Sequence, residues 1–150
     1  MWKKKISILC ICFMIGVSLI SCKKSEKMQD GYYTAEAAEY SHGWKEYVTI
    51  CVMENQIVSV EYNAKNASGF IKSWDMAYMR NMNSVNGTYP NAYTRAYAAQ
   101  LFKGQGENSV DMVSGASSSG RNFVELSAAV VERAKNGDTS IAVLELDHEE

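Results

Sequence analysis

Tyr47-Val48-Thr49-Ile50-Cys51-Val52-Met53 is the run from which the fold class can be worked out. The polar turn Glu54-Asn55-Gln56 and a second run, Ile57 to Tyr62, follow it. Apolar residues recur at alternate positions in these runs, and many are β-branched or aromatic, which is typical of strands. A short polar connection between two such runs favours an antiparallel hairpin. A Tyr- and Thr-rich run, Gly31 to Ala38, precedes them and extends the hairpin to a meander. This half of the chain therefore predicts an antiparallel sheet.

After Gly69 the spacing of the apolar residues changes from that of a strand to that of a helix. One helical face is formed by Phe70, Ile71, Trp74, Tyr78 and Met82. Ser68 is the residue type that caps helix starts, so we expect the helix to begin there. Residues 83–91 contain the only proline of the chain and the pair Asn86-Gly87, which together predict a loop.

Two more helices and a last strand are expected. A helix over Asn91–Lys103 would bury Tyr93, Tyr97 and Leu101, and Gly104-Gln105-Gly106 would end it. A longer helix over Ser118–Asn136 presents Phe123, Leu126, Val130 and Ala134 on one stripe, and Gly137 follows as a stop signal. The run Ser140–Leu146 has the composition of a strand. The fold class is therefore α+β, with helices packed on one face of a mainly antiparallel sheet.

The front of the chain is a targeting segment. Three lysines at positions 3–5 precede an apolar stretch, Ile6 to Ile20, which is shorter than the roughly 20 residues that span a bilayer. The sequence Leu19-Ile20-Ser21-Cys22 matches the bacterial lipobox, in which the cysteine is lipidated and becomes the first residue of the mature protein. We expect a signal peptide over 1–21, a lipidated tether over 22–30 and one domain over 31–150. An uncleaved membrane anchor is the alternative.

Composition excludes several classes of partner. Removing residues 1–21 takes away three lysines and no acidic residue, so the formal net charge changes from −2 to −5. An acidic body of this kind is unsuited to bind nucleic acid. Cys51 is the one cysteine left in the folded body, so no disulfide is expected within it, and a small apolar residue on the sheet is the simplest interpretation. His42 and His148 lack a cluster of further ligands at metal spacing, and we expect no metal.

The run Val110-Asp111-Met112-Val113-Ser114-Gly115-Ala116-Ser117-Ser118-Ser119-Gly120 combines a carboxylate, a Gly-Ala turn and four hydroxyls immediately before a helix. The start of a helix offers unpaired N–H groups and the positive end of the peptide dipole, so an anion can bind there without a basic side chain. The alternative is structural, because serine is a common cap and glycine a common turn residue. Asp111 in particular can simply stabilise the turn.

This run resembles the flavinylation signature of the FMN-binding domain family. The matching positions are Asp111, Ser114, Gly115, Ala116, Ser117 and Ser119. The resemblance also covers residues 30–37, 43–50, 60–63, 74–79 and 87–95, so it extends over most of the chain after Asp30. In all of these stretches the chain is similar to the small secreted lipoproteins of that family.

The resemblance implies that FMN is the cofactor and that a dedicated transferase, with FAD as donor, joins its phosphate to the hydroxyl at Ser117. In that case Asp111 is a candidate to orient this hydroxyl for the transferase, with the shaping of the turn as its alternative role. Serine stands there in place of the usual threonine, and Ser118 and Ser119 offer neighbouring hydroxyls, so covalent and non-covalent flavin both stay open. Trp74, Tyr78, Tyr93 and Tyr97 are candidates for stacking on the isoalloxazine ring, with the core as their alternative place. Arg95 is a candidate donor to the phosphate or to the reduced ring, or else a surface ion-pair residue.

The leading functional hypothesis is an FMN carrier, not an enzyme, that passes electrons between membrane donors and acceptors outside the cytoplasm. It would be held by lipidated Cys22 at the cell membrane or outer membrane. The second hypothesis is a lipid-anchored module that scavenges flavin, or a surface antigen without a redox role. A flavin-dependent reductase is the third, although the sequence reveals no substrate pocket for one.

Overall fold

The computed structural model describes residues 27–107 and 110–146. The elements follow the order β1 (Gly31–Ala37), β2 (Lys45–Met53), β3 (Gln56–Lys65), the 3-10 turn η1 (Lys72–Trp74), α1 (Met76–Asn86), α2 (Pro90–Gly104), α3 (Ser117–Asn136) and β4 (Ala142–Leu144). Residues 1–21, Cys22 and the start of the expected tether lie outside the described residues. Within the described part, no helix is both long and apolar enough to cross a bilayer.

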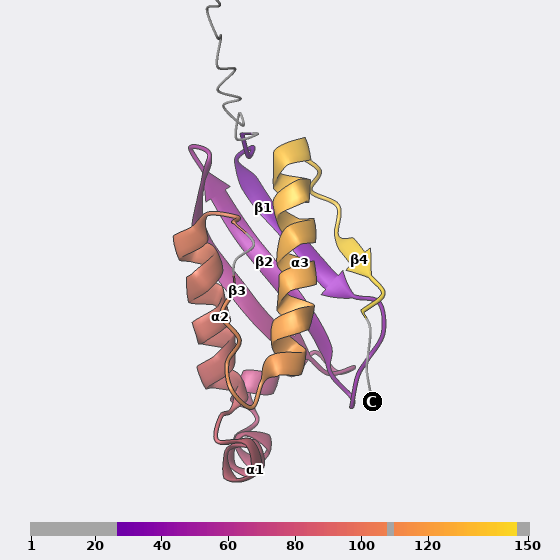
Figure 1. Cartoon of the computed structure of the whole chain (residues 1–150). Coiled ribbons are helices and arrows are strands. Elements are labelled where there is room, and N and C mark those ends of the chain that lie inside the picture. Colours follow the sequence, from indigo (N-terminus) through magenta and orange to yellow (C-terminus); the bar gives the residue numbers. More distant parts are fainter. Residues whose placement is uncertain (1–26, 108–109, 147–150) are drawn as a thin grey trace, which may run out of the picture.

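The four strands form one sheet in the order β3-β2-β1-β4. β2 pairs antiparallel with both neighbours, as the hairpin pattern predicts, whereas β4 pairs parallel with β1. Figure 1 shows α2 and α3 side by side over the same face of the sheet, with α1 at one end of the molecule. The predicted α+β class with a mainly antiparallel sheet is therefore confirmed.

The core lies between this face of the sheet and the two long helices. Val48 and Ile50 of β2 and Phe123 and Leu126 of α3 have no exposed surface. Phe123 also stacks on Tyr97 of α2, with 5.5 Å between the ring centroids. Burying each of these large side chains contributes about 1.5–3 kcal/mol relative to leaving it exposed. The predicted stripe of α3 is therefore its buried face. Cys51 is buried and free.

The first helix is present, but its predicted start at Ser68 was wrong. Asp75 caps α1, because its carboxylate accepts a hydrogen bond from the Tyr78 N–H at 2.9 Å. Ser68 instead lies in a turn, where the Asn66 side chain accepts from the Ser68 and Phe70 N–H groups. Phe70, Ile71 and Trp74 therefore lie in this turn and in η1, whereas Tyr78 and Met82 lie in α1, which itself buries no residue.

The predicted loop over residues 83–91 was also too long. α1 continues to Asn86, and Gly87, with φ of 69°, ends it in the left-handed conformation. Pro90 is the first residue of α2, where its missing N–H costs no helical hydrogen bond. The connection between the helices is therefore only residues 87–89. The last strand is confirmed, although it is shorter than predicted.

Candidate functional site

A cavity of about 370 Å³ opens where the β1–β2 loop, η1, α1 and the start of α3 meet. This volume lies at the lower end of the roughly 300–1,000 Å³ that is usual for small-molecule sites. The lining combines glycine, hydroxyl, charged and aromatic residues: Ala37, Glu39, Ser41, His42, Trp44, Glu46, Lys72, Tyr78, Met82, Asn86, Tyr93, Gly115, Ala116, Ser117, Ser118, Ser119, Asn122 and Leu146.

The loop before α3 has a shape that only glycine at position 115 allows. Gly115 has φ of 78°, which L-residues rarely adopt, and a Cβ at this position would lie 2.2 Å from the carbonyl oxygen of Asn86. The loop is also held from the side of α2. The Tyr97 hydroxyl accepts from the Val113 N–H at 2.9 Å and donates to the Ala116 carbonyl at 3.0 Å. Hydrogen bonds thus hold the loop at Val113 and Ala116, and Gly115 packs closely against Asn86 between them.

The start of α3 offers free donors to the cavity. The cap residue is Ala116, whose side chain has no oxygen to accept from the N–H groups of the first turn. Ser117 and Ser118 are exposed, and Ser119 is half-buried. The cavity therefore meets the first-turn N–H groups, the positive end of a 20-residue helix and three hydroxyls at one point. These groups favour a bound anion.

Lys72 adds a positive charge to the same cavity. Its Nζ lies 4.8 Å from the ring centroid of Tyr78 and 6.0 Å from that of Trp44. Burial lowers the pKa of Lys72, but Tyr93, Tyr78 and Glu46 together raise it more, so the pKa is above its usual value. Lys72 is therefore charged at neutral pH, with two aromatic faces beside it.

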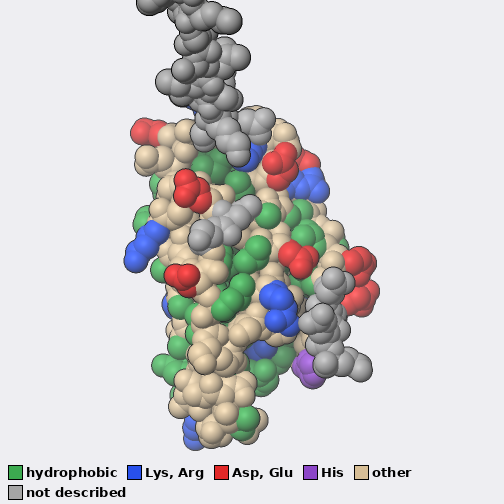
Figure 2. Space-filling model, viewed as in Figure 1, with side chains coloured by type: hydrophobic (Ala, Val, Ile, Leu, Met, Phe, Trp, Pro, Cys, Tyr) green, Lys and Arg blue, Asp and Glu red, His purple; other side chains and the backbone are tan. Residues whose placement is uncertain are grey.

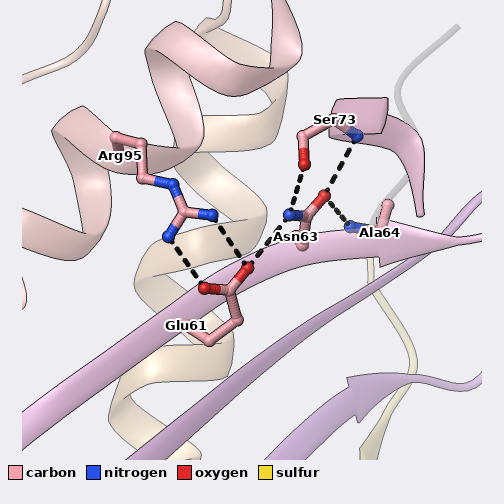
Figure 3. Close-up of polar contacts among 5 residues, drawn as sticks. All are labelled: Glu61, Asn63, Ala64, Ser73 and Arg95. Carbon is pink, nitrogen blue, oxygen red and sulfur yellow. Dashed lines mark hydrogen bonds and ion pairs between the residues drawn. The ribbon is translucent and has the colours of Figure 1, made fainter. Parts of the chain in front are cut away.

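The position of Lys72 depends on a buried asparagine in β3. The Asn63 side-chain amide donates to Ser73 Oγ at 2.8 Å, and its oxygen accepts from the Ala64 N–H at 3.0 Å and the Ser73 N–H at 3.4 Å. Figure 3 shows these contacts joining β3 to η1. Because Ser73 follows Lys72 directly, Asn63 fixes the backbone that carries the ammonium group.

A carboxylate lies on the other side of the cavity. Glu46 accepts hydrogen bonds from Ser119 Oγ at 2.9 Å and from Asn122 Nδ2 at 2.8 Å, one to each oxygen. The hydroxyl of Tyr62 donates to the Ser119 carbonyl at 2.7 Å, and burial, followed by Glu46, raises the pKa of Tyr62 well above its usual value. Ser119 is therefore held on both its hydroxyl and its carbonyl. Ser117 and Ser118 are the cavity-lining serines of the run that stay exposed.

The structure brings six of the predicted site residues to the cavity and leaves five outside it. The six that line it are Gly115, Ala116, Ser117, Ser119, Tyr78 and Tyr93, and the five that do not are Asp111, Ser114, Trp74, Arg95 and Tyr97. Tyr93 is buried, and burial, countered in part by Lys72, raises its pKa.

The residues outside the cavity have other contacts. Arg95 pairs with Glu61 at 2.8 and 3.4 Å, and Figure 3 shows this pair above β3. Trp74 is 64% exposed and lies edge-on to Phe70. The main chain of Asp111 is bound by the Gln100 side chain at 2.6 and 3.0 Å. These contacts match the surface ion-pair alternative for Arg95, and they give Asp111 a structural place in the loop.

Sequence reasoning missed several residues that line the cavity. Lys72 and Asn122 lie far apart in the chain and carry no local motif. Trp44 and Glu46 lie within residues 43–50, one of the stretches that support the family resemblance. That resemblance was therefore the one signal that pointed to this part of the site.

Replacing Tyr97 with phenylalanine is expected to lower the free energy of unfolding by about 1–3 kcal/mol, because the Val113 N–H and the Ala116 carbonyl each lose a partner. Urea denaturation measures the loss, and amide hydrogen exchange at Val113 measures the loosening of the loop. Tyr33→Phe is the matched control, because this buried hydroxyl bonds to the Gln29 carbonyl instead. Exchange at Val113 that stays as slow as in the wild type would contradict the role of Tyr97.

On the face shown in Figure 2, acidic and basic side chains are interspersed, so no broad basic surface for nucleic acid is visible there. Within residues 27–107 and 110–146, no three potential metal ligands among His, Cys, Asp and Glu come together.

No model of a known protein family matches the chain. The chain is 28% identical over 131 residues to the 15 kDa lipoprotein of Treponema pallidum (strain Nichols), a match that covers 87% of this chain and 89% of that protein. The crystal structure of the CPE2226 protein from Clostridium perfringens matches with a TM-score of 0.75 and 30% identity, covering 80% of this chain and 99% of that one. A solution NMR structure from Clostridium thermocellum matches with a TM-score of 0.50 and 26% identity, covering 82% of this chain and all of that one. The chain is thus similar in sequence to a bacterial lipoprotein, and it belongs to the same family as the CPE2226 protein.

Proposed function

We propose that the protein is a membrane-anchored lipoprotein that holds FMN in this cavity and carries electrons outside the cytoplasm. The observation that carries the proposal is that the uncapped start of α3, the serine hydroxyls and the Lys72 ammonium all meet in one cavity. The membrane part rests on the lipobox that ends at Cys22 and on the similarity to a treponemal lipoprotein. The flavin part rests on the chemistry of the cavity and on the resemblance of residues 111–119 to a flavinylation signature.

The residues of the cavity fit the parts of FMN. The first-turn N–H groups of α3, Ser118 and Lys72 would hold the phosphate, whose negative charge suits a helix start and an ammonium group. The faces of Tyr78 and Trp44 would pack against the ring system. When bound, FMN supplies reversible electron transfer, and the protein adjusts its potential by burial and hydrogen bonding.

Covalent attachment would use Ser117. Its Oγ forms a bond to the flavin-side phosphorus of FAD, the phosphoanhydride bond breaks, AMP leaves and the hydroxyl proton is released. A flavin transferase supplies this chemistry in the proposal, and the exposed position of Ser117 leaves its hydroxyl accessible to such an enzyme. Ser119 is less available, because Glu46 already accepts from its hydroxyl.

The first experiment is an absorption spectrum of the body, residues 23–150, made with and without a flavin transferase and FAD, and then precipitated with acid. Yellow colour that stays in the pellet is expected if FMN is linked covalently, whereas colour in the supernatant indicates reversible binding. A colourless protein that also ignores added FMN would overturn the flavin proposal and favour the antigen hypothesis.

Lys72→Gln is expected to weaken FMN binding about tenfold or more in protein made without the transferase. A hydrogen bond to a charged group contributes about 1.5–3 kcal/mol, and 1.4 kcal/mol corresponds to a factor of ten. Riboflavin, which lacks the phosphate, should bind as before. Flavin fluorescence titrations measure both affinities.

Lys65→Gln is the matched control, because Lys65 pairs with Glu36 at 2.9 Å and does not line the cavity. Equal weakening of FMN and riboflavin by Lys72→Gln would show that Lys72 does not recognise the phosphate.

A further inference from the structure

The cavity and the start of the domain lie at opposite ends of the molecule. α3 begins at the cavity with Ser117 and runs to the other end, where Ala134 lies in its last turns. At 1.5 Å per residue, this separates the two ends by about 26 Å. β1 runs between the same ends, from Gly31 to the cavity residue Ala37. Figure 1 shows α3 and β1 spanning this length, with α1 at the cavity end.

The chain before β1 is fastened to the end far from the cavity. The Met28 N–H donates to Asn55 Oδ1 at 2.7 Å, in the turn between β2 and β3. The Gln29 N–H donates to the Ala134 carbonyl of α3 at 2.8 Å. Met28 also packs against the core. From Met28 onward, the chain is therefore fixed to the end of the domain that lies far from the cavity.

This geometry limits how the domain can face a bilayer that holds Cys22. Six peptide units separate Cys22 from Met28, and they reach at most about 22 Å. To point the cavity end of an upright domain at the same bilayer, this segment would have to run fully extended back along the domain, and its reach of about 22 Å is shorter than the roughly 26 Å between the two ends. That arrangement costs conformational entropy and separates the lysines at positions 23, 24 and 27 from the headgroups they would otherwise meet near the anchor.

We infer that the cavity of the anchored protein faces away from the bilayer that holds Cys22, and that its electron partner is a redox protein reaching it from the aqueous phase. A carrier dissolved in the anchoring bilayer would not reach the cavity. The inference rests on the lipid anchor and the flavin of the proposed function. It adds the orientation of the domain and the class of partner.

Tryptophan fluorescence can test this orientation, because Trp44 and Trp74 are the two tryptophans that follow Cys22. Trp44 lines the cavity, and Trp74 lies in η1 at the same end. The mature lipidated chain, which begins at Cys22 and is free of flavin, is placed in vesicles whose phospholipids carry bromine near the headgroup, and its emission is compared with that in unbrominated vesicles. We expect no loss of emission from the wild-type protein.

The matched reporter for the other end combines Trp44→Phe, Trp74→Phe and Asn136→Trp. Asn136 is exposed in the last turn of α3, so a tryptophan there should fold normally and should lose emission to the brominated lipid. The result expected is quenching of this reporter alone. Quenching of the wild-type protein that equals or exceeds that of the reporter, or quenching of neither protein, would overturn the orientation.

Flotation of the vesicles and added FMN separate the failure of this inference from that of the proposed function. A chain that does not float with the vesicles lacks the anchor, which overturns both the inference and the lipoprotein proposal. A chain that floats and shows the expected quenching but never binds FMN supports the orientation and overturns the flavin proposal. In that case the aqueous partner is not an electron partner.

Discussion

Ser117→Ala is expected to abolish covalent attachment of FMN, leaving an acid-precipitated pellet without colour and a chain without the added mass of FMN. The reason is that alanine removes the hydroxyl that would bond to phosphorus, and the other two serine hydroxyls of the run that line the cavity are differently placed. Ser119 donates to Glu46, and Ser118, although exposed, lies one position away from the acceptor that the resemblance implies. Intact-mass analysis after incubation with transferase and FAD measures the loss.

Ser118→Ala and Ser119→Ala are the matched controls, because each removes one hydroxyl from the same helical turn. Both variants should keep the covalent colour. Reversible FMN binding should survive Ser117→Ala, since alanine keeps the N–H group at the start of α3. Attachment that persists in Ser117→Ala and disappears in one of the controls would identify a different acceptor and contradict the assignment of Ser117.

Gly115→Ala is expected to lower the free energy of unfolding by several kcal/mol. Two costs add. An alanine at φ of 78° is strained by roughly 1–2 kcal/mol, and its Cβ would overlap the carbonyl oxygen of Asn86, which is backbone and can move only with the end of α1. The cavity should be distorted at the same time, so FMN affinity should fall together with stability. Urea denaturation and an FMN titration measure the two effects.

Gly43→Ala separates the strain from the overlap. Gly43 has φ of 83°, but a Cβ there would meet no heavy atom within 4 Å. This variant should therefore lose only about 1–2 kcal/mol. Equal losses in the two variants would show that the contact between residue 115 and Asn86 is not what requires glycine.

The sheet and α3 could be predicted because their signals are local. The alternation of apolar residues in β2 and the stripe of apolar residues on α3 each indicate one face of the element, and that face is buried in the core. The start of α1 could not be predicted from apolar spacing, because its boundary is set by a cap, Asp75, while Asn66 folds the chain around Ser68 into a turn. Both a capping residue and the spacing of apolar residues indicate where a helix begins. When the two disagree, the sequence alone does not show which of them sets the first residue of the helix.

The candidate site was predictable only where one continuous stretch forms it. The turn at residues 115–119 carries its chemistry in its own sequence, so it could be found. Lys72 is positioned at the cavity because Asn63, a buried residue of β3, forms hydrogen bonds with the neighbouring Ser73. No sequence motif predicts these hydrogen bonds. Arg95 illustrates the opposite case, because it is chemically suited to bind phosphate but the fold pairs it with Glu61.

The parallel pairing of β4 with β1 sets the order in which the protein can fold. Ala35 of β1 pairs with Ala142 of β4, so the first strand is completed by almost the last residues of the domain. Contacts this distant in sequence give a high contact order and slow folding. One edge of β1 therefore stays unpaired until residues 142–144 have been synthesised. If residues 1–21 act as the proposed export signal, this delay favours a chain that is still unfolded when it is moved across a membrane.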